Sequence, residues 1–328
     1  MNTIGDDVTK STKLFEKMLM VGYVNEDFEK VQWDAINELT KKLIILPKDS
    51  DQITNELLQT DCLLVKLGAS VDNNIIDLAP MLKYIGMLGT GYGRIDTKYA
   101  SIKGISVCNI AGYSTESVAE FAIGIILEYL REIERGKKQV REENYSESGF
   151  NAREIKNKAI GIIGLGRIGG RIADIAHSGF GANVMYWSRT RKINYEQNGI
   201  PYQDINIILK ECDIISVNLA LTPDTDKILS KEKLRLIKKG AVLLNLSPME
   251  LIDIEALELH LQNGDFFFIF DHSDEVQPEI VKRLVAYKNC IVYPPIAYIS
   301  QEASIAKREM FINNIKNYLK GVPTNKVN

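Results

Sequence analysis

Short apolar runs alternate with amphipathic stretches along most of the chain. Helix-like segments such as 27–40 and 52–59 separate the runs. This alternation is typical of parallel sheets with helices on both faces. We therefore predict a doubly wound α/β protein with two parallel sheets. The expected strands form a first set of five (18–23, 42–46, 62–66, 84–88 and 105–108) and a second set of six (159–164, 182–187, 213–219, 241–246, 266–271 and 290–293).

Three further segments fall outside this alternation. Residues 117–132 are apolar on most helical faces, which predicts a helix buried between domains or between subunits. The charged stretch 134–148 predicts a solvated arm of low order, and 301–319 predicts a helix that returns to the first domain. The apolar helix over 118–130 and the arm together indicate a two-fold homodimer.

The composition narrows the class of protein. A chain of 328 residues is too long for one ordinary α/β core and fits two. The net charge of −3, with 45% hydrophobic and 25% charged residues, fits a globular protein and leaves no basic footprint for nucleic acid. No run approaches the ~20 apolar residues of a membrane span, and residues 1–13 hold no apolar signal core. We therefore expect neither a membrane nor a nucleic acid as a partner.

The spacing of the cysteines indicates the redox state of the cellular compartment. Cys62, Cys108, Cys212 and Cys290 are the four cysteines, and none lies in a CxxC pair. Three of them border apolar runs, which favours buried free thiols over metal ligands or disulfides. Free thiols are typical of a reducing compartment, so we expect a cytoplasmic protein without a metal.

The most informative motif is AIGIIGLGRIGG, which contains GxGxxG at Gly164, Gly166 and Gly169. It follows an apolar strand and opens a helix expected over 167–177, which is the context of a dinucleotide-binding loop. Gly164 then allows a tight turn, Gly166 lets the backbone approach a pyrophosphate, and Gly169 lets the helix pack on the strand. The free N–H groups at the helix start bind the anion. The predicted contacts are Gly164, Gly166, Arg167, Ile168 and Gly169.

The residues at the end of the next strand determine whether such a site prefers NAD(H) or NADP(H). An NAD site carries Asp or Glu there, which accepts from the ribose 2′-hydroxyl. This chain reads YWSRTRK over 186–192, without a carboxylate that would repel a 2′-phosphate. Hydroxyl and guanidinium groups bind phosphate, so the sequence favours NADP(H); a solvated basic loop on an NAD(H) site is the alternative. The predicted phosphate contacts are Ser188, Arg189, Thr190 and Arg191.

Several motifs in a fixed order extend this reading. They are LGTGYGRID (88–96), GYSTESVAE (112–120), the glycine loop and LTPDT (221–225). With these motifs the chain resembles the D-2-hydroxyacid dehydrogenase family, nearer to its glyoxylate/hydroxypyruvate reductase branch, over roughly residues 62–303. The resemblance implies a Rossmann domain (111–297) inserted into a flavodoxin-like substrate domain (1–110 and 298–328), with the active site in the cleft.

The resemblance also implies particular contacts. Further cofactor contacts are expected from Thr115, Leu219, Thr225 and Asn245. Asp271 is expected to bind the nicotinamide carboxamide. The backbone N–H groups of the loop 67–70 are expected to hold a substrate carboxylate, with contacts from Leu67, Gly68 and Ala69.

The family's chemistry also needs an Arg that polarises the substrate carbonyl, a His that transfers a proton at its oxygen, and an acid that orients the His. The family pattern close to NTARGGLVD corresponds here to NLSPMELID, which puts Pro248 at the Arg position. A TPHIAG-like segment corresponds to YPPIAY, which puts Pro295 at the His position. Proline has neither a titratable group nor an N–H. We therefore expect the family's usual reaction to be slow or absent unless another residue substitutes.

Four residues are candidates for the missing groups. Glu275, with Asp274 as the other possibility, resembles the family's acid, and a solvated loop charge is the alternative. Lys66 ends a first-domain strand beside the substrate loop and can supply positive charge, unless it is a flexible surface lysine. His272 lies at the carboxyl end of the second sheet, where ligands bind in such folds, and Tyr298 follows the proline segment. A loop role for His272 and a packing role for Tyr298 are the alternatives.

Two functions are compatible with these residues. The first is an NADPH-dependent oxidoreductase with non-standard acid–base residues, which transfers hydride to a small carbonyl or 2-oxo acid-like substrate. The second is a catalytically inactive NADP(H)-binding homologue that acts as a sensor or partner subunit. The intact glycine loop favours both, while the loss of the Arg and the His disfavours an ordinary 2-hydroxyacid dehydrogenase.

Overall fold

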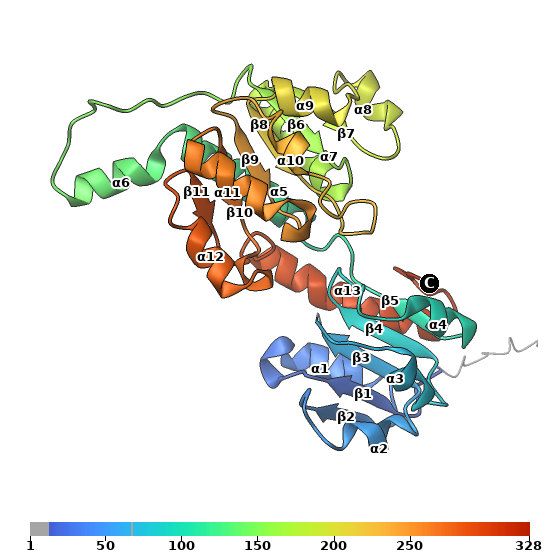
Figure 1. The fold of residues 1–328 in the computed structure, drawn as a ribbon. Coiled ribbons are helices and arrows are strands. Elements are labelled where there is room, and N and C mark those ends of the chain that lie inside the picture. Colours follow the sequence, from blue (N-terminus) through green and yellow to red (C-terminus); the bar gives the residue numbers. More distant parts are fainter. Residues whose placement is uncertain (1–12, 67) are drawn as a thin grey trace, which may run out of the picture. The chain divides into compact units, whose positions relative to one another are not determined.

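The computed structural model describes residues 13–66 and 68–328. The chain forms two compact units, each with its own parallel sheet (Figure 1). The first unit is built from the chain up to Tyr113 and from Gln301–Asn328, and the second from Ser114–Ser300. The second unit is therefore an insertion in the first, with junctions close to the positions 110 and 297 that the resemblance implies.

The first unit holds a five-stranded sheet in the order β2-β1-β3-β4-β5, and all neighbouring strands are parallel. This is the order of a flavodoxin-like domain, which the resemblance implies. The strand order reverses between β1 and β3, and ligands bind outside the carboxyl ends of strands at such a switch point. The strands are β1 (Met18–Val21), β2 (Leu43–Leu46), β3 (Cys62–Lys66), β4 (Tyr84–Leu88) and β5 (Ser106–Cys108).

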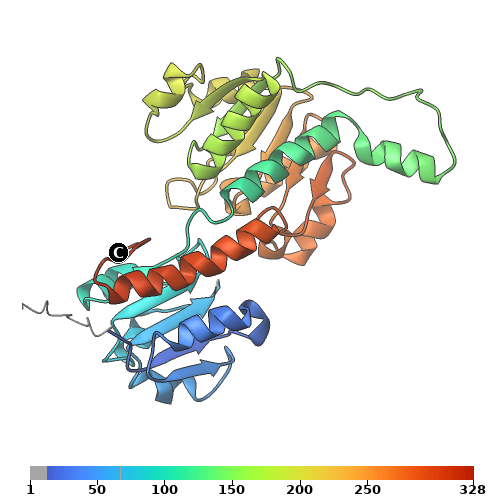
Figure 2. The ribbon, with the colours of Figure 1, turned by 180° about the vertical axis from the view of Figure 1, so that it is seen from behind.

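Alternating side chains of this sheet enter two separate apolar cores. The helices are α1 (Lys30–Asn37), α2 (Ile53–Leu57), α3 (Asn73–Asp77), α4 (Thr97–Ile102) and α13 (Gln301–Leu319). Met20 and Leu64 pack on one face with α1 and α13, which Figure 2 shows side by side on that face. Leu19 and Leu63 pack on the other face with α2, α3 and α4. Successive strand residues therefore point to different helix layers.

The second unit holds a six-stranded parallel sheet in the order β11-β10-β9-β8-β6-β7. Its switch point lies between β6 and β8, and the glycine loop directly follows β6. The strands are β6 (Ala159–Ile163), β7 (Asn183–Trp187), β8 (Ile214–Val217), β9 (Val242–Asn245), β10 (Phe267–Phe270) and β11 (Cys290–Val292). Each strand lies within a residue or two of its predicted limits.

Helices cover both faces of this second sheet. Residues of α5 and α7 form the apolar core on one face, and residues of α9, α10, α11 and α12 form the core on the other face. The helices are α5 (Thr115–Leu130), α6 (Ile133–Arg141), α7 (Arg167–Asp174), α8 (Ile193–Gln197), α9 (Ile205–Glu211), α10 (Lys231–Leu234), α11 (Ile254–Asn263) and α12 (Pro278–Leu284).

Two of the predicted segments differ from the structure. The arm expected to be of low order contains helix α6, which is stabilised by pairs such as Glu134–Lys137, 2.7 Å apart. This helix is rich in charged residues, and Ile133 and Val140 are its only large apolar side chains, so its apolar periodicity is too weak for the pattern to predict it. The helix after the glycine loop ends at Asp174 and continues as a π-helical turn, Ile175–Gly179.

Helix α5 buries its apolar side chains within its own unit. Ala122 and Ile126 are completely buried and belong to the core that α5 shares with α7. The stripe that α5 leaves exposed carries Glu116, Glu120 and Gly124. The apolar sequence of this helix is therefore explained by the core of the second unit.

Candidate functional site

The glycine loop has the steric features that a dinucleotide site requires. Gly164 has a φ of +102°, and a Cβ atom there would lie 2.4 Å from the carbonyl oxygen of Asn218. A Cβ atom at Gly169 would lie 2.1 Å from the carbonyl oxygen of Gly164. Both positions therefore accept only glycine. A Cβ atom at Gly166 would meet no atom within 4 Å, so it would instead occupy open space beside the loop.

That open space lies at the start of α7, which begins at Arg167 directly after Gly166. The first N–H groups of a helix have no partner within it, and together with the helix dipole they attract anions. The side chain of Arg167 is exposed and adds positive charge. Free N–H groups beside a glycine without obstruction fit the pyrophosphate of a nicotinamide dinucleotide.

The loop after β7 holds the residues predicted to bind a 2′-phosphate. The Ser188 hydroxyl donates to the carbonyl oxygen of Thr190 at 2.6 Å, which turns the loop back on itself. Arg189 is exposed and has no ion-pair partner among the residues that the structure describes. Arg191 is paired, since its Nε donates to Oε1 of Glu196 at 3.0 Å. The two arginines therefore differ in their availability to a ligand.

Glu196 is a carboxylate that the sequence pattern did not place at this site. It lies on α8 and also accepts from the Tyr186 hydroxyl at 2.9 Å. That hydroxyl accepts in turn from the backbone N–H of Lys192 at 2.6 Å. The hydrogen bond from Arg191 lowers the pKa of Glu196, which keeps the carboxylate charged. The segment 186–192 itself holds no carboxylate, as the sequence shows, but the fold brings one to it from the next helix.

Three other predicted cofactor contacts differ in what they already bind. Thr115 is the first residue of α5. Leu219 follows β8, and a Cβ atom at Gly164 would lie 2.8 Å from its Cδ2. Thr225 is 6% exposed, and its hydroxyl donates to the carbonyl oxygen of Ala220 at 2.7 Å. The Thr225 hydroxyl therefore holds the loop after β8 in its conformation.

Asn245 is the last residue of β9 and is completely buried. Its Oδ1 accepts from the backbone N–H of Ser247 at 3.2 Å. Within the described part of the chain, its Nδ2 and the Oδ1 of Asn218 are buried without a hydrogen-bond partner. Buried amide groups are nearly always satisfied, so two such groups after neighbouring strands favour a polar ligand at this edge of the sheet.

The segments after β9, β10 and β11 share one edge of the sheet, because these strands are neighbours in register. Pro248, Asp271 and Pro295 lie in these segments. Asp271 is 1% exposed, and its carboxylate accepts the backbone N–H groups of Ile296 at 3.1 Å and Ala297 at 3.3 Å. Burial raises the pKa of Asp271. The Asp271 carboxylate therefore fixes the segment that contains Pro295.

The predicted substitutes on this edge are less constrained. His272 is half-buried, and its ring centroid lies 6.4 Å from that of Phe270. Glu275 is exposed and ends a short 3-10 turn, and Tyr298 is 37% exposed. None of these three side chains forms a hydrogen bond within residues 13–66 and 68–328. Nothing in their surroundings fixes them for proton transfer.

Lys66 in the first unit is held firmly at the end of β3. Its ammonium lies 2.8 and 2.9 Å from the two carboxylate oxygens of Asp27, which follows β1. It also lies 5.8 Å from the ring centroid of Tyr23, whose hydroxyl donates to the carbonyl oxygen of Val65 at 3.0 Å. Lys66 is therefore not a flexible surface lysine, but its charge is balanced by Asp27.

The loop after Lys66 was predicted to hold a substrate carboxylate. Leu67 lies outside the described residues. The N–H of Ala69 donates to the carbonyl oxygen of Lys66 at 3.1 Å, so this donor is used within the loop. Gly68 has a φ of +86°, and a Cβ atom there would meet no atom within 4 Å.

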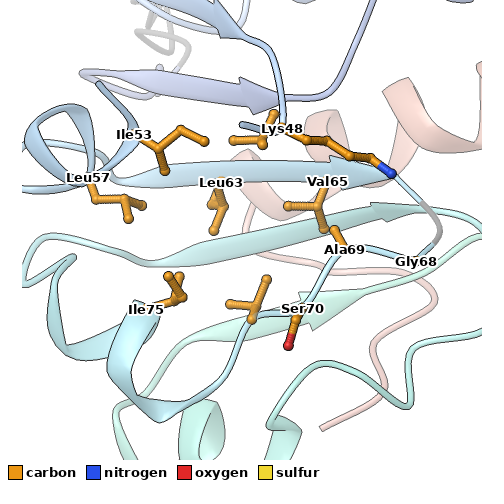
Figure 3. A pocket seen from close by; sticks show the side chains of 11 residues that line it. Lys48, Ile53, Leu57, Leu63, Val65, Gly68, Ala69, Ser70 and Ile75 are labelled. Carbon is orange, nitrogen blue, oxygen red and sulfur yellow. The ribbon is translucent and has the colours of Figure 1, made fainter. Parts of the chain in front are cut away.

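Figure 3 shows a cavity of about 290 Å³ beside this loop. Most of its lining is apolar, and Lys48 and Ser70 contribute the polar side chains that the figure labels. Val65 lines the cavity, whereas the next residue, Lys66, points to the opposite face of the sheet. The cavity and the Lys66–Asp27 pair are therefore separate features.

Two residues of α13 at the carboxyl edge of the first sheet were missed by the sequence pattern. Arg308 Nε donates to the carbonyl oxygen of Asp27 at 3.0 Å, and Arg308 Nη1 lies 3.3 Å from Glu29. Lys307 is half-buried. The Arg308–Asp27 contact joins positions that are 281 residues apart, so no local motif signals it.

Other classes of site have little support in the described residues. Among them, no group of three or more His, Cys, Asp or Glu side chains is arranged to hold a metal ion. No helix in the same residues has the length and apolar character of a membrane span. The four cysteines are buried free thiols.

Comparison with known proteins finds relatives that cover most of this chain. Residues 123–297 match the family described as D-isomer specific 2-hydroxyacid dehydrogenase, NAD binding domain. A glyoxylate reductase of Thermococcus litoralis is 32% identical over 285 residues, which cover 84% of this chain and 86% of that protein. A putative 2-hydroxyacid dehydrogenase of Staphylococcus epidermidis is 32% identical over 281 residues, which cover 83% of this chain and 87% of that protein.

Solved structures of related enzymes are also similar to this chain over nearly its whole length. The D-lactate dehydrogenase from Aquifex aeolicus, complexed with NAD and lactic acid, has a TM-score of 0.82 and 27% identity, and the match covers 93% of this chain and 96% of that chain. An acyclic imino acid reductase in complex with NADPH and D-Arg has a TM-score of 0.82 and 27% identity, with 95% and 100% covered. Both likenesses extend over the two parallel-sheet units.

Proposed function

The chain belongs to the D-isomer-specific 2-hydroxyacid dehydrogenase family, and from this premise we propose that it is an NADP(H)-binding oxidoreductase that reduces a small carbonyl or 2-oxo acid-like substrate. The nicotinamide cofactor supplies the hydride when it is bound. The glycine loop carries the proposal, because Gly164 and Gly169 fit only as glycine while Gly166 leaves room for a ligand. The N–H groups at the start of α7 then bind the pyrophosphate.

We propose that NADP(H) is preferred to NAD(H). Arg189 supports this preference, because its guanidinium is exposed and unpaired within the described residues and can bind a phosphate through two hydrogen bonds. Glu196 limits the contribution of Arg191, since the carboxylate competes with a phosphate for it. Similar structures contain NADPH in one case and NAD in another, so likeness alone favours neither cofactor.

The acid–base chemistry of the reaction is proposed to differ from that of the family. Pro248 and Pro295 stand where an Arg and a His are expected, and neither proline can donate a proton. A 2-imino acid reaches an enzyme already protonated on nitrogen, so it needs a hydride at carbon but no proton at the reacting nitrogen. The similarity to an acyclic imino acid reductase supports this class of substrate as a second candidate.

The same two prolines favour an alternative function, which is NADP(H) binding without hydride transfer in a sensor or partner subunit. In this alternative the glycine loop and Arg189 keep their roles. The two functions differ in one result, because an inactive homologue binds the cofactor tightly but never oxidises it.

Cofactor titration followed by a substrate panel tests these proposals. Binding of NADPH and NADH is measured by nucleotide fluorescence, and NADPH oxidation is followed at 340 nm with aldehydes and 2-oxo acids, each with and without ammonium or methylamine. We expect tighter binding of NADPH and oxidation by at least one substrate. Tighter binding of NADH contradicts the preference, and binding without oxidation by any substrate supports the inactive homologue. Failure to bind either nucleotide contradicts both functions.

We also propose that the protein is a cytoplasmic homodimer. The exposed apolar side chains of Ile133, Val140 and Tyr145 on the arm support the dimer, and the four buried free thiols support a reducing compartment. Light scattering tests the dimer. A monomeric mass for the wild-type protein contradicts it, and a dimer that persists when all three side chains are replaced by Ser contradicts the role of the arm.

A further inference from the structure

Helix α13 crosses the first sheet from the carboxyl ends of its strands to their amino ends. Near the end of the helix, the ring centroid of Tyr318 lies 4.8 Å from that of Tyr84, the first residue of β4. Earlier in the helix, the Phe311 ring lies 5.9 Å from that of Phe28, which follows the carboxyl end of β1. Lys307 is one turn before Phe311 and therefore lies ~6 Å farther in the direction of the carboxyl ends.

Lys307 belongs to the stripe of α13 that faces the sheet. Lys307, Phe311 and Ile315 are spaced by four residues, so they lie on the same side of the helix. Phe311 is 1% exposed and Ile315 is completely buried in the core shared with α1. Lys66 at the end of β3 points into this same layer. The stripe thus brings the Lys307 ammonium to the switch-point edge, where the sheet ends.

Two ion pairs form around Asp27 and Glu29 at this edge, and they do not include Lys307. Lys66 pairs with Asp27 at 2.8 Å, and Arg308 pairs with Glu29 at 3.3 Å. Lys307 has no ion-pair partner in the described part of the chain. Of these five charged groups, Lys307 is therefore the one without an ion pair.

The surroundings of Lys307 make this unbalanced charge costly. Burial lowers the pKa of Lys307, the carboxylate of Asp27 opposes this effect, and the charges of Lys66 and Arg308 reinforce it. A half-buried ammonium without a counter-ion destabilises the folded state, and a bound anion would offset that cost. The site has the features of an anion-binding site rather than of a structural ion pair.

We infer that Lys307 binds the carboxylate of the substrate at the switch-point edge of the first unit. This inference rests on the proposed function and assigns a residue to the binding of its substrate. Lys66 and Arg308 act as positioning residues, because they fix Asp27 and α13 around the Lys307 ammonium. One unpaired positive charge matches a monocarboxylate, so a 2-oxo or 2-imino monocarboxylic acid fits better than a neutral aldehyde.

The test replaces Lys307 by Met, which keeps the length of the side chain and removes its charge. The matched control is Lys98→Met, because Lys98 is an exposed lysine of the same unit. The probe is oxamate, an unreactive monocarboxylate analogue, and its binding to the NADPH complex is measured by calorimetry. We expect Lys307→Met to weaken oxamate binding about tenfold or more, as the loss of a charge-assisted contact does, with unchanged affinity for NADPH. The control should bind both ligands as the wild type does.

Two results overturn the inference: oxamate binds Lys307→Met as tightly as the wild type, or the wild type binds neither oxamate nor glyoxylate. Failure of the wild type to bind NADPH instead overturns the proposed function. In that case competitive acetylation with acetic anhydride still tests Lys307 without cofactor. A bound carboxylate favours the charged form of Lys307, which does not react, so slower acetylation of Lys307, but not of Lys98, in excess oxamate supports the inference. Equal rates with and without oxamate overturn it.

Discussion

Arg191 donates its Nε to Glu196 at 3.0 Å, so the carboxylate of the following helix already occupies one of the two arginines in the loop after β7. Arg189, two residues earlier, has no such partner in the described part of the chain. Selectivity for a 2′-phosphate should therefore depend mainly on Arg189, although the sequence motif predicts a phosphate contact from both arginines.

Arg189→Ala should weaken NADPH binding by about tenfold to a hundredfold, the usual effect of losing a charge-assisted hydrogen bond. NADH lacks the phosphate, so its affinity should stay the same. Titration of both nucleotides by fluorescence measures the two constants. Equal weakening of NADPH and NADH would show that Arg189 contributes to folding or to the pyrophosphate site rather than to phosphate selection.

Glu196→Gln should have the opposite effect. The amide no longer pairs with Arg191 as a charge, so the guanidinium becomes available to a phosphate, and NADPH should bind more tightly than to the wild type. The Tyr186 hydroxyl keeps an acceptor in the Gln side-chain oxygen, which preserves the local fold. Unchanged or weaker NADPH binding in the same titration would mean that Glu196 orients Arg191 for the ligand instead of competing with it.

The glycine loop allows a matched pair of substitutions. Gly166→Ala adds a methyl group to open space, so it should leave the melting temperature unchanged and weaken cofactor binding. Gly169→Ala puts a methyl group 2.1 Å from the carbonyl oxygen of Gly164, so it should lower the melting temperature of the protein itself. Calorimetry with and without NADPH separates the two effects. An unstable Gly166→Ala or a stable Gly169→Ala would refute this assignment of the two glycines.

The strands and the glycine loop could be predicted from the sequence, because both are determined by residues that are close together along the chain. The strands appeared as apolar runs because both faces of a parallel sheet are buried. The glycine loop was recognisable because its glycines are required by contacts within a short segment of the chain. A Cβ atom at Gly169, for example, would clash with the carbonyl oxygen of Gly164. Local patterns therefore gave the fold and the cofactor loop.

The charge partners could not be predicted in the same way. Glu196 reaches Arg191 only because a turn and the helix α8 return it to the loop. Arg308 donates to the carbonyl oxygen of Asp27, which is 281 residues away in the sequence. Lys307 reaches the same edge because α13 packs on the first sheet after the whole second unit has intervened. A charged residue on a helix has the same sequence pattern whether it faces solvent or a binding site, so only the fold distinguishes the two.

Pro248→Arg combined with Pro295→His should create reduction of glyoxylate by NADPH. Both positions lie on the edge formed by β9, β10 and β11, and Asp271 already fixes the backbone beside Pro295. A general acid contributes about 10²–10⁴-fold, and residues that act as a unit are non-additive, so each single variant should gain much less. Steady-state rates at 340 nm measure the gain, with Pro294→Ala as the control. A folded double variant without any gain would mean that more of the site has diverged than these two residues.

Lys307→Met should also raise the stability of the ligand-free protein at neutral pH. The lysine binds its proton less tightly in the folded state than in the unfolded chain, where its pKa is near the usual value of 10.5. Below both pKa values the full cost of the buried charge is present. Between the lowered folded pKa and 10.5 the unfolded chain binds more protons, so the stability of the wild type rises with pH in this window.

The difference between wild type and Lys307→Met should therefore be largest near pH 7 and should shrink as the pH approaches 10.5. Asp27, Lys66 and Arg308, the charged groups that act on Lys307, are present in both proteins, so their own contributions largely cancel in the comparison. Melting temperatures from pH 7 to pH 10.5 measure the effect, and Lys98→Met should show no such trend. A variant that is less stable than the wild type at pH 7 would mean that Lys307 already has a counter-ion in the ligand-free fold, whereas the expected gain would show that the protein keeps this cation at the switch-point edge at a cost in stability.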